Sequence, residues 1–134
     1  MAPRGVIRVR IVATVGRGES RRESLQALAD CVHRLNVDFL RAHPDFPRLF
    51  DSGVRYDREP TSVREEFCTI PVVYDQGWGD CDDIAPWRSA ELVVRRGIHA
   101  RPLVVRSSPR AWHVIVETPH GREDPCIRLG MGSE

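Results

Sequence analysis

The strongest constraint on the fold is a stripe of apolar side chains in the first third of the chain. These side chains recur at alternating spacings of three and four residues, at Leu25, Leu28, Val32, Leu35 and Phe39. Side chains with this spacing share one face of an α-helix. We therefore predict a helix of about 22 residues, from a Ser20–Glu23 capping box to the neighbourhood of His43–Pro44. Its apolar face is expected to pack on the core of the same domain; packing on a partner helix is the alternative.

The segments on either side of this helix carry the signals of further strands and of a second helix. Apolar residues alternate with arginines within residues 6–15, which predicts a strand with one exposed face. Residues 81–96 are predicted to form a helix, with Asp80 as its N-cap and Gly97 as its stop. An antiparallel meander of three strands is predicted over residues 101–106, 111–117 and 122–129.

This order of elements predicts an α+β fold, and 134 residues are enough for one compact domain. Residues 1–60 would supply the first strand, the long helix and a loop, and residues 66–130 the core. The connection from residue 44 to residue 79 is rich in Pro, Gly, Asp and Arg. Connections of this length often wrap a functional site. Cys68 lies in the apolar part of this connection and is expected in the core.

The charge pattern argues against several classes of function. The 20 basic residues are all arginine, they are spread along the chain, and 19 acidic residues balance them. No basic block indicates a nucleic-acid partner, and arginines interrupt the apolar start of the chain, which argues against a signal peptide or a membrane span. The four cysteines lack the spacing of a zinc site. We expect a cytoplasmic protein without a metal or another cofactor.

One cysteine stands where a loop becomes a helix, in the stretch Gly-Trp-Gly-Asp-Cys-Asp-Asp, residues 77–83. A thiol in the first turn of a helix faces unpaired N–H groups and the positive end of the helix dipole, which both favour the thiolate. The same N–H groups are able to hold an oxyanion. Cys81 is therefore a candidate nucleophile, although the carboxylates of Asp80, Asp82 and Asp83 oppose its ionisation unless they point elsewhere.

A cysteine nucleophile needs a base, and His113 is the one histidine in the middle of a predicted strand. If Pro119–His120 is a two-residue turn, Thr118 faces Gly121 and His113 faces Cys126. Asp124 is then a diagonal neighbour of His113 on the same face, where its carboxylate would orient the imidazole ring. The same register makes Cys126 a rival thiol beside His113.

Cys81, His113 and Asp124 lie in sequence stretches that resemble a known family. The stretches WGDCDDIAPWRSAELVVRRGIHARPLVV, WHVIVE and EDP resemble the core of the transglutaminase-like superfamily, which has a papain-type fold. GDCDD is similar to the Gly-Asp-Cys-Glu-Asp stretch of bacterial transglutaminase-like cysteine proteinases, and GWGDCDD resembles phage-encoded members. The resemblance covers about residues 66–130. It implies a cysteine protease or hydrolase with Cys81 as nucleophile, His113 as general base and acid, and Asp124 as the orienting acid.

The resemblance also implies an oxyanion donor upstream of the cysteine. Gln76 is the candidate, and the indole N–H of Trp78 is the rival. Trp78 and Trp112 are candidates for lining the substrate cleft, although aromatic side chains of this kind often belong to the core.

Several functional alternatives stay open at this stage. The implied reaction is attack on an amide or peptide bond of a peptide or protein substrate, with hydrolysis favoured over transamidation. One alternative is a non-catalytic phage or structural binding module that retains the fold, and another is a leader peptidase of the lasso-peptide type from the same superfamily. The acidic cluster at residues 80–83 is explained by helix capping, and Ca²⁺ binding is its alternative. No membrane partner is expected, and the sequence leaves the oligomeric state open.

Overall fold

The computed structural model describes residues 2–14, 18–58, 65–109 and 111–131. These described residues are 45% helical and 26% strand. The elements follow in this order: β1 (Arg10–Ala13), α1 (Gly18–Ala42), the 3₁₀ turn η1 (Leu49–Asp51), β2 (Arg55–Tyr56), β3 (Glu65–Cys68), α2 (Ile70–Gln76), β4 (Trp78–Gly79), α3 (Cys81–Arg96), β5 (Arg101–Ser108), β6 (Ala111–Thr118), β7 (Gly121–Glu123) and α4 (Pro125–Arg128).

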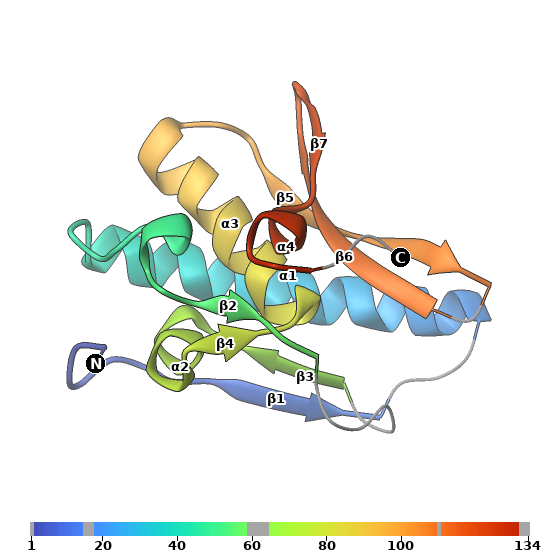
Figure 1. Ribbon diagram of the computed structural model, residues 1–134, viewed down its shortest axis with the longest axis horizontal. Coiled ribbons are helices and arrows are strands. Elements are labelled where there is room, and N and C mark those ends of the chain that lie inside the picture. The colour runs from blue at the N-terminus through green and yellow to red at the C-terminus, as the bar shows by residue number, and fades with distance from the viewer. Residues whose placement is uncertain (1, 15–17, 59–64, 110, 132–134) are drawn as a thin grey trace.

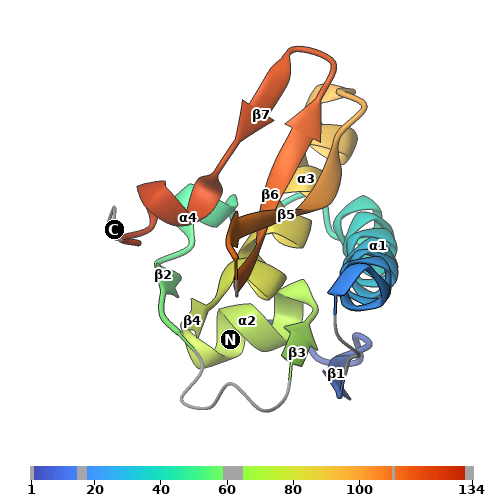
Figure 2. The same ribbon diagram turned by 90° about the vertical axis from the view of Figure 1, so that its right-hand side faces the viewer.

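The strands form three small sheets around the two long helices (Figure 1). β1 pairs antiparallel with β3, β2 pairs parallel with β4, and β5, β6 and β7 form an antiparallel meander. α3 packs against α1, β5 and β6. Figure 2 shows α1 and β1 on one side of the molecule, with β2, β4 and α4 on the other. α3 is therefore the central element, and its first residue lies where β4 ends.

The long helix α1 buries a face slightly different from the predicted stripe. Leu25 and Val32 are buried as expected, whereas Leu28, Leu35 and Phe39 are only half-buried at the flank of this face. The remaining fully buried side chains of α1 are Ala29, Asn36, Val37 and Leu40. Small Ala29 and hydrogen-bonded Asn36 allow close packing that a search for large apolar residues does not reveal.

Two predicted boundaries near the N-terminus are wrong. α1 begins at Gly18, so Ser20 lies inside the helix and cannot form the predicted capping box. The first strand covers only Arg10–Ala13, because only these residues pair with β3, and Ile7 is 75% exposed. Val15 of the predicted strand lies outside the described residues.

The core consists of two apolar clusters that meet at α3. One cluster joins α1, α2 and α3 and includes Trp87 and Cys68, as predicted for this cysteine. The other joins α1 and α3 to the β5–β6 hairpin and includes Val114 and Val116. Cys81 packs against both clusters, which places the start of α3 at their junction. Within the described residues, no helix has the length and apolar character needed to cross a membrane.

The last predicted strand, residues 122–129, is wrong beyond Glu123. The predicted two-residue turn is present, and Thr118 faces Gly121. β7 then ends after three residues and the chain turns into the short helix α4, with Asp124 as its N-cap. Pro125 has no N–H for a sheet ladder, and the Asp124 carboxylate accepts the N–H of Cys126 instead. His113 therefore does not face Cys126 across a ladder.

Candidate active site

The start of α3 is fixed by reciprocal hydrogen bonds. The Asp80 carboxylate accepts the N–H of Asp82, and the Asp83 carboxylate accepts the N–H groups of Asp80 and Cys68. Gly79 suits the close packing at this junction, because a Cβ atom there would lie 3.0 Å from the Cβ of Asp83. The predicted helix bounds, N-cap and Gly97 stop are all confirmed. This local frame holds Cys81 in the first turn of a helix.

Cys81 lies against one edge of strand β6. Its sulfur accepts a hydrogen bond from the backbone of Val114, the residue after His113. β7 pairs with Val116–Thr118 only, so the part of β6 before Val116 has no strand on that side. In an antiparallel ladder, Val114 directs its N–H to the same edge as Val116 and Thr118. The sulfur thus occupies the place that a continued β7 would have taken.

The predicted contact between His113 and Asp124 is present. Nε2 of His113 lies 2.6 Å from Oδ2 of Asp124, and both side chains are largely buried. The other carboxylate oxygen of Asp124 accepts the N–H of Cys126, so the acid orients the imidazole and caps α4 at the same time. An ion pair between Arg88 of α3 and Glu123 fixes the corner that precedes Asp124.

No hydrogen bond joins the side chains of Cys81 and His113 among the described residues. The Cys81 thiol instead donates to Oδ1 of Asp82, at 3.9 Å. Nδ1 of His113 makes no hydrogen bond within the described part of the chain. Because Nε2 is held by Asp124, Nδ1 is the ring nitrogen that is left to accept a proton. Such contacts are often long in enzymes without substrate and tighten in the complex.

The carboxyl groups around Cys81 have raised pKa values. Burial raises the pKa of Asp82 well above its ordinary value, and so do the charge of Asp80 and a hydrogen bond with Glu65. Burial also raises the pKa of Asp80, as does its neighbour Asp83. Protonation of one group in this cluster relieves the repulsion among the others. The cluster therefore retains protons above the pH at which an exposed carboxyl group loses its own.

The expected effect of the helix start on Cys81 is outweighed by its surroundings. Burial raises the pKa of the Cys81 thiol well above its ordinary value, and the carboxylates of Asp82 and Asp80 raise it further. The hydrogen bond from Val114 acts in the opposite direction. The opposing effect predicted for the flanking carboxylates is therefore present at Asp82 and Asp80, and together with burial it outweighs the helix N-terminus. A base that accepts the proton is needed for this thiol to act as a nucleophile.

The Asp82→Asn variant is expected to gain stability relative to the wild type as the pH rises from about 5 to about 8. With its raised pKa, folded Asp82 holds a proton that the unfolded chain has already released. This stabilisation is complete below the ordinary pKa and is lost as the pH rises through the raised one. Asparagine keeps a donor toward Glu65 and does not titrate.

The difference in unfolding free energy should change by at most about 1.4 kcal/mol per pH unit in this range. Urea denaturation of both proteins at several pH values measures it. The surface variant Asp30→Asn serves as a control, because Asp30 is exposed. A difference between Asp82→Asn and the wild type that does not depend on pH would contradict the raised pKa.

The two predicted oxyanion donors are differently placed. The side-chain amide of Gln76, at the end of α2, donates to the carbonyl oxygen of Trp78 at 2.6 Å, and its oxygen accepts from Arg10. This amide is thus tethered to its own loop. Trp78 is half-buried, and alternation along β4 directs its indole away from the face on which Gly79 meets Asp83.

The remaining residue of the predicted site, Trp112, is the second residue of β6. Its ring is half-buried against the cluster of the β5–β6 hairpin, and the guanidinium of Arg106 lies 4.3 Å from the ring centroid. Alternation places Trp112 on the face opposite His113. Trp112 is therefore a core and cation–π residue in this structure, and its predicted place in a substrate cleft rests on the resemblance alone.

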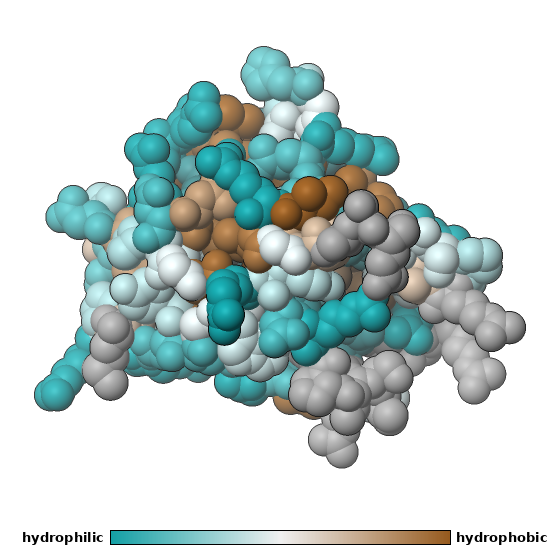
Figure 3. Space-filling view, viewed as in Figure 1, coloured by the Kyte–Doolittle hydropathy of each residue, from teal (hydrophilic) through white to brown (hydrophobic). Residues whose placement is uncertain are grey.

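An apolar surface lies beside the His113–Asp124 pair. Ile127, in α4, is 59% exposed, and the half-buried side chains of Leu129 and Met131 follow it. Figure 3 shows brown, apolar atoms gathered where Figure 1 draws α4 and β6. The sequence analysis missed this surface, because it placed Ile127 in a strand. The Asp124–Pro125 step could have indicated the helix, because Asp is a common N-cap and Pro a common first residue of a helix.

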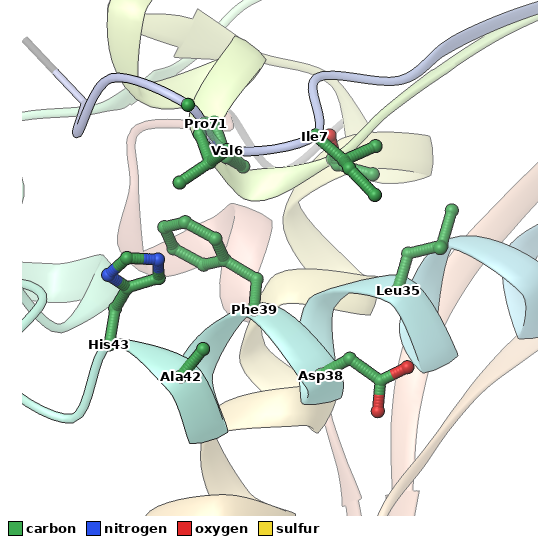
Figure 4. Close-up of a pocket in the computed structure, with 10 residues that line it drawn as sticks. Val6, Ile7, Leu35, Asp38, Phe39, Ala42, His43 and Pro71 are labelled. Atoms are coloured by element: carbon green, nitrogen blue, oxygen red, sulfur yellow. The ribbon is translucent and has the colours of Figure 1, made fainter.

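A cavity lies away from the candidate site. This cavity of about 280 Å³ lies between the N-terminal segment and the end of α1, and none of the predicted site residues lines it. Figure 4 shows Val6, Ile7 and Pro71 on one side of it, opposite Leu35 and Phe39 of α1. Among the described residues there is no cluster of His, Cys, Asp or Glu suited to hold a metal ion.

The chain matches no model of a known protein family, no curated protein and no solved structure.

Proposed function

We propose that the protein is a cysteine-dependent hydrolase or acyltransferase that acts on amide or peptide bonds through Cys81, His113 and Asp124. The main support for this proposal is the position of the His113 imidazole, whose Nε2 lies 2.6 Å from Oδ2 of Asp124. The next residue of the same strand, Val114, hydrogen-bonds through its backbone to the Cys81 sulfur. An imidazole held by a carboxylate close to a thiol is the arrangement that thiol nucleophiles require. It supports the resemblance to a transglutaminase-like core of papain type.

The reaction would begin when Nδ1 of His113 takes the proton of the Cys81 thiol. The thiolate attacks the substrate carbonyl carbon, a C–S bond forms, and the carbonyl π electrons move to the oxygen. When this intermediate collapses, His113 donates the proton to the departing amine and a thioester remains. Water, activated by His113, then releases the acid and restores the thiol. Asp124 keeps the ring oriented and stabilises the imidazolium in both halves.

A peptidase is the favoured form of this activity. Hydrolysis needs only water as acceptor, whereas transamidation needs a second site for an amine. The apolar surface around Ile127 adjoins the site and would suit an apolar side chain of a peptide substrate. Transamidation remains the alternative, because the two reactions share every step up to the thioester.

Selective alkylation of Cys81 tests the proposal, and the chain contains its own controls. Cys31 is exposed, whereas Cys68 and Cys126 are buried with pKa values raised by burial. Iodoacetamide at about pH 6.5, where an ordinary thiol is mostly protonated, should label Cys81 at least tenfold faster than Cys31. Peptide mass spectrometry over a time course gives the four rates.

One observation favours a different function. The Cys81 thiol approaches Asp82, and its pKa is raised by burial and by two carboxylates, which suits an inert core thiol. A chain of this kind would be a binding module, and the exposed face of α1 would be its contact surface. In that case Cys81 is labelled more slowly than Cys31 in the folded protein, and at the same rate as the other cysteines in denaturant. This result would replace the enzymatic proposal.

A further inference from the structure

Tyr56 is brought to the candidate site by two sets of backbone hydrogen bonds. β2 pairs parallel with β4, so that Tyr56 stands beside Gly79, two residues before Cys81. The N–H of Asp57 donates to the carbonyl oxygen of Gly79 at 2.9 Å. On its other side, the N–H of Tyr56 donates to the carbonyl oxygen of Leu129 at 3.0 Å, at the end of α4. Tyr56 is thus fastened between the strand that leads to Cys81 and the helix that Asp124 caps.

The side chain of Tyr56 lies on the same side as the start of α3. Partners in a parallel pair share a face, and a Cβ on Gly79 would point at Asp83 in the first turn of α3. In agreement with this direction, Tyr56 packs against the cluster that contains Cys126 and that Cys81 also contacts. Trp78, the neighbouring residue in β4, belongs to the opposite face. Tyr56 is therefore better placed than Trp78 to reach the space in front of Cys81.

Electrostatic effects agree with this placement. Burial raises the pKa of the Tyr56 phenol, and charge on the Cys81 and Cys126 sulfurs raises it as well. A hydrogen bond with the side chain of Arg58 lowers it. Because an arginine only donates, the phenol oxygen accepts this bond and its own O–H is left to donate. The phenol is therefore a neutral, oriented donor within electrostatic reach of the nucleophilic sulfur.

We propose that the hydroxyl of Tyr56 is a catalytic donor that binds the oxyanion formed when Cys81 attacks a carbonyl carbon. The backbone N–H of Cys81 is the second donor; it makes no hydrogen bond within the described residues, whereas the N–H groups of Asp82 and Asp83 are bonded to Asp80. The proposal rests on the proposed function and replaces Gln76, whose amide is tethered to Trp78. No bond to Tyr56 forms or breaks, and its proton stays on the phenol.

The test compares two reactions of the same sulfur. Acylation of Cys81 by p-nitrophenyl acetate passes through an oxyanion, whereas alkylation by iodoacetamide displaces iodide and forms none. Tyr56→Phe is expected to slow acylation about a hundredfold and to leave alkylation within about twofold of the wild type. The control is Tyr74→Phe, a half-buried tyrosine of α2 that stacks edge-on with Phe46. Both rates should be unchanged in this control.

A second variant keeps the proposal testable if Tyr56→Phe does not fold. Arg58→Ala alters only an exposed side chain and leaves the phenol in place without its oriented partner. It is expected to slow acylation about tenfold at unchanged alkylation, because a donor that has lost its orientation binds the oxyanion less well. Unchanged acylation in both variants, or an equal loss of acylation and alkylation, overturns the role of Tyr56. A wild-type Cys81 that reacts with neither reagent overturns the proposed function instead.

Discussion

The His113→Ala variant is expected to acylate Cys81 with p-nitrophenyl acetate about a thousandfold more slowly than the wild type. Burial and the carboxylates of Asp82 and Asp80 raise the pKa of the Cys81 thiol, so this thiol does not ionise by itself near neutral pH. In the proposed mechanism the imidazole of His113 takes this proton. Without it the sulfur stays protonated, and a thiol is a far weaker nucleophile than a thiolate. Release of p-nitrophenolate in the first turnover measures the rate.

Two further variants make this experiment specific. Asp124→Asn keeps one oxygen to accept the N–H of Cys126, but it directs an amide N–H at Nε2 of the imidazole; the ring proton then sits on Nδ1, and we expect a loss comparable to that of His113→Ala. His120→Ala removes an exposed histidine in the turn before β7 and should leave the rate within about twofold. Circular dichroism of each variant controls for folding. Equal rates in His113→Ala and His120→Ala would rule out His113 as the base.

The largest expected effect on stability is that of Trp87→Ala, at about 4 kcal/mol of unfolding free energy. Trp87 is fully buried in the cluster that joins α1, α2 and α3. Its indole N–H donates to Oε1 of Glu91 at 3.1 Å, and Glu91 also accepts the N–H of Leu49. The variant therefore leaves a cavity. It also removes a hydrogen bond to the buried Glu91 carboxylate, which accepts the N–H of Leu49 at the start of η1. A small domain is stable by only about 5–15 kcal/mol, so the loss is severe.

Trp78→Ala is the matched control for this prediction. It removes the same side chain from a half-buried position that belongs to neither apolar cluster, and it should cost less than about 1 kcal/mol. Urea denaturation followed by far-ultraviolet circular dichroism avoids any dependence on tryptophan fluorescence. A similar loss in both variants would contradict the assignment of Trp87 to the main core.

The sequence was most informative where local signals determine the structure. α3 runs from Cys81 to Arg96 as predicted, because an N-cap, an acidic first turn and a glycine stop all lie within the helix or next to it. The β5–β6 hairpin is also close to its predicted bounds. The contact between His113 and Asp124 was predicted from the register of the next turn, and that register is correct as far as Glu123.

Features that depend on the packing of distant segments were not predictable in the same way. Asp124 reaches His113 as the N-cap of a helix and not as a strand residue, since Pro125 ends the ladder. The balance of effects on the Cys81 pKa depends on burial by two clusters that only the folded chain creates. Tyr56 lies 25 positions before Cys81 and carries no motif, so only the β2–β4 pairing reveals its place.

The early end of β7 also determines how much of the edge of β6 is left without a partner strand. A central strand with free N–H and C=O groups along one edge invites strands of other molecules to join the sheet. Here the Cys81 sulfur accepts the hydrogen bond of the Val114 backbone at this edge of β6. The chain turns into α4 directly after β7, so the paired part of the sheet stays short. A single Asp-Pro step thus both brings Asp124 to His113 and ends the ladder before it offers a long edge for pairing.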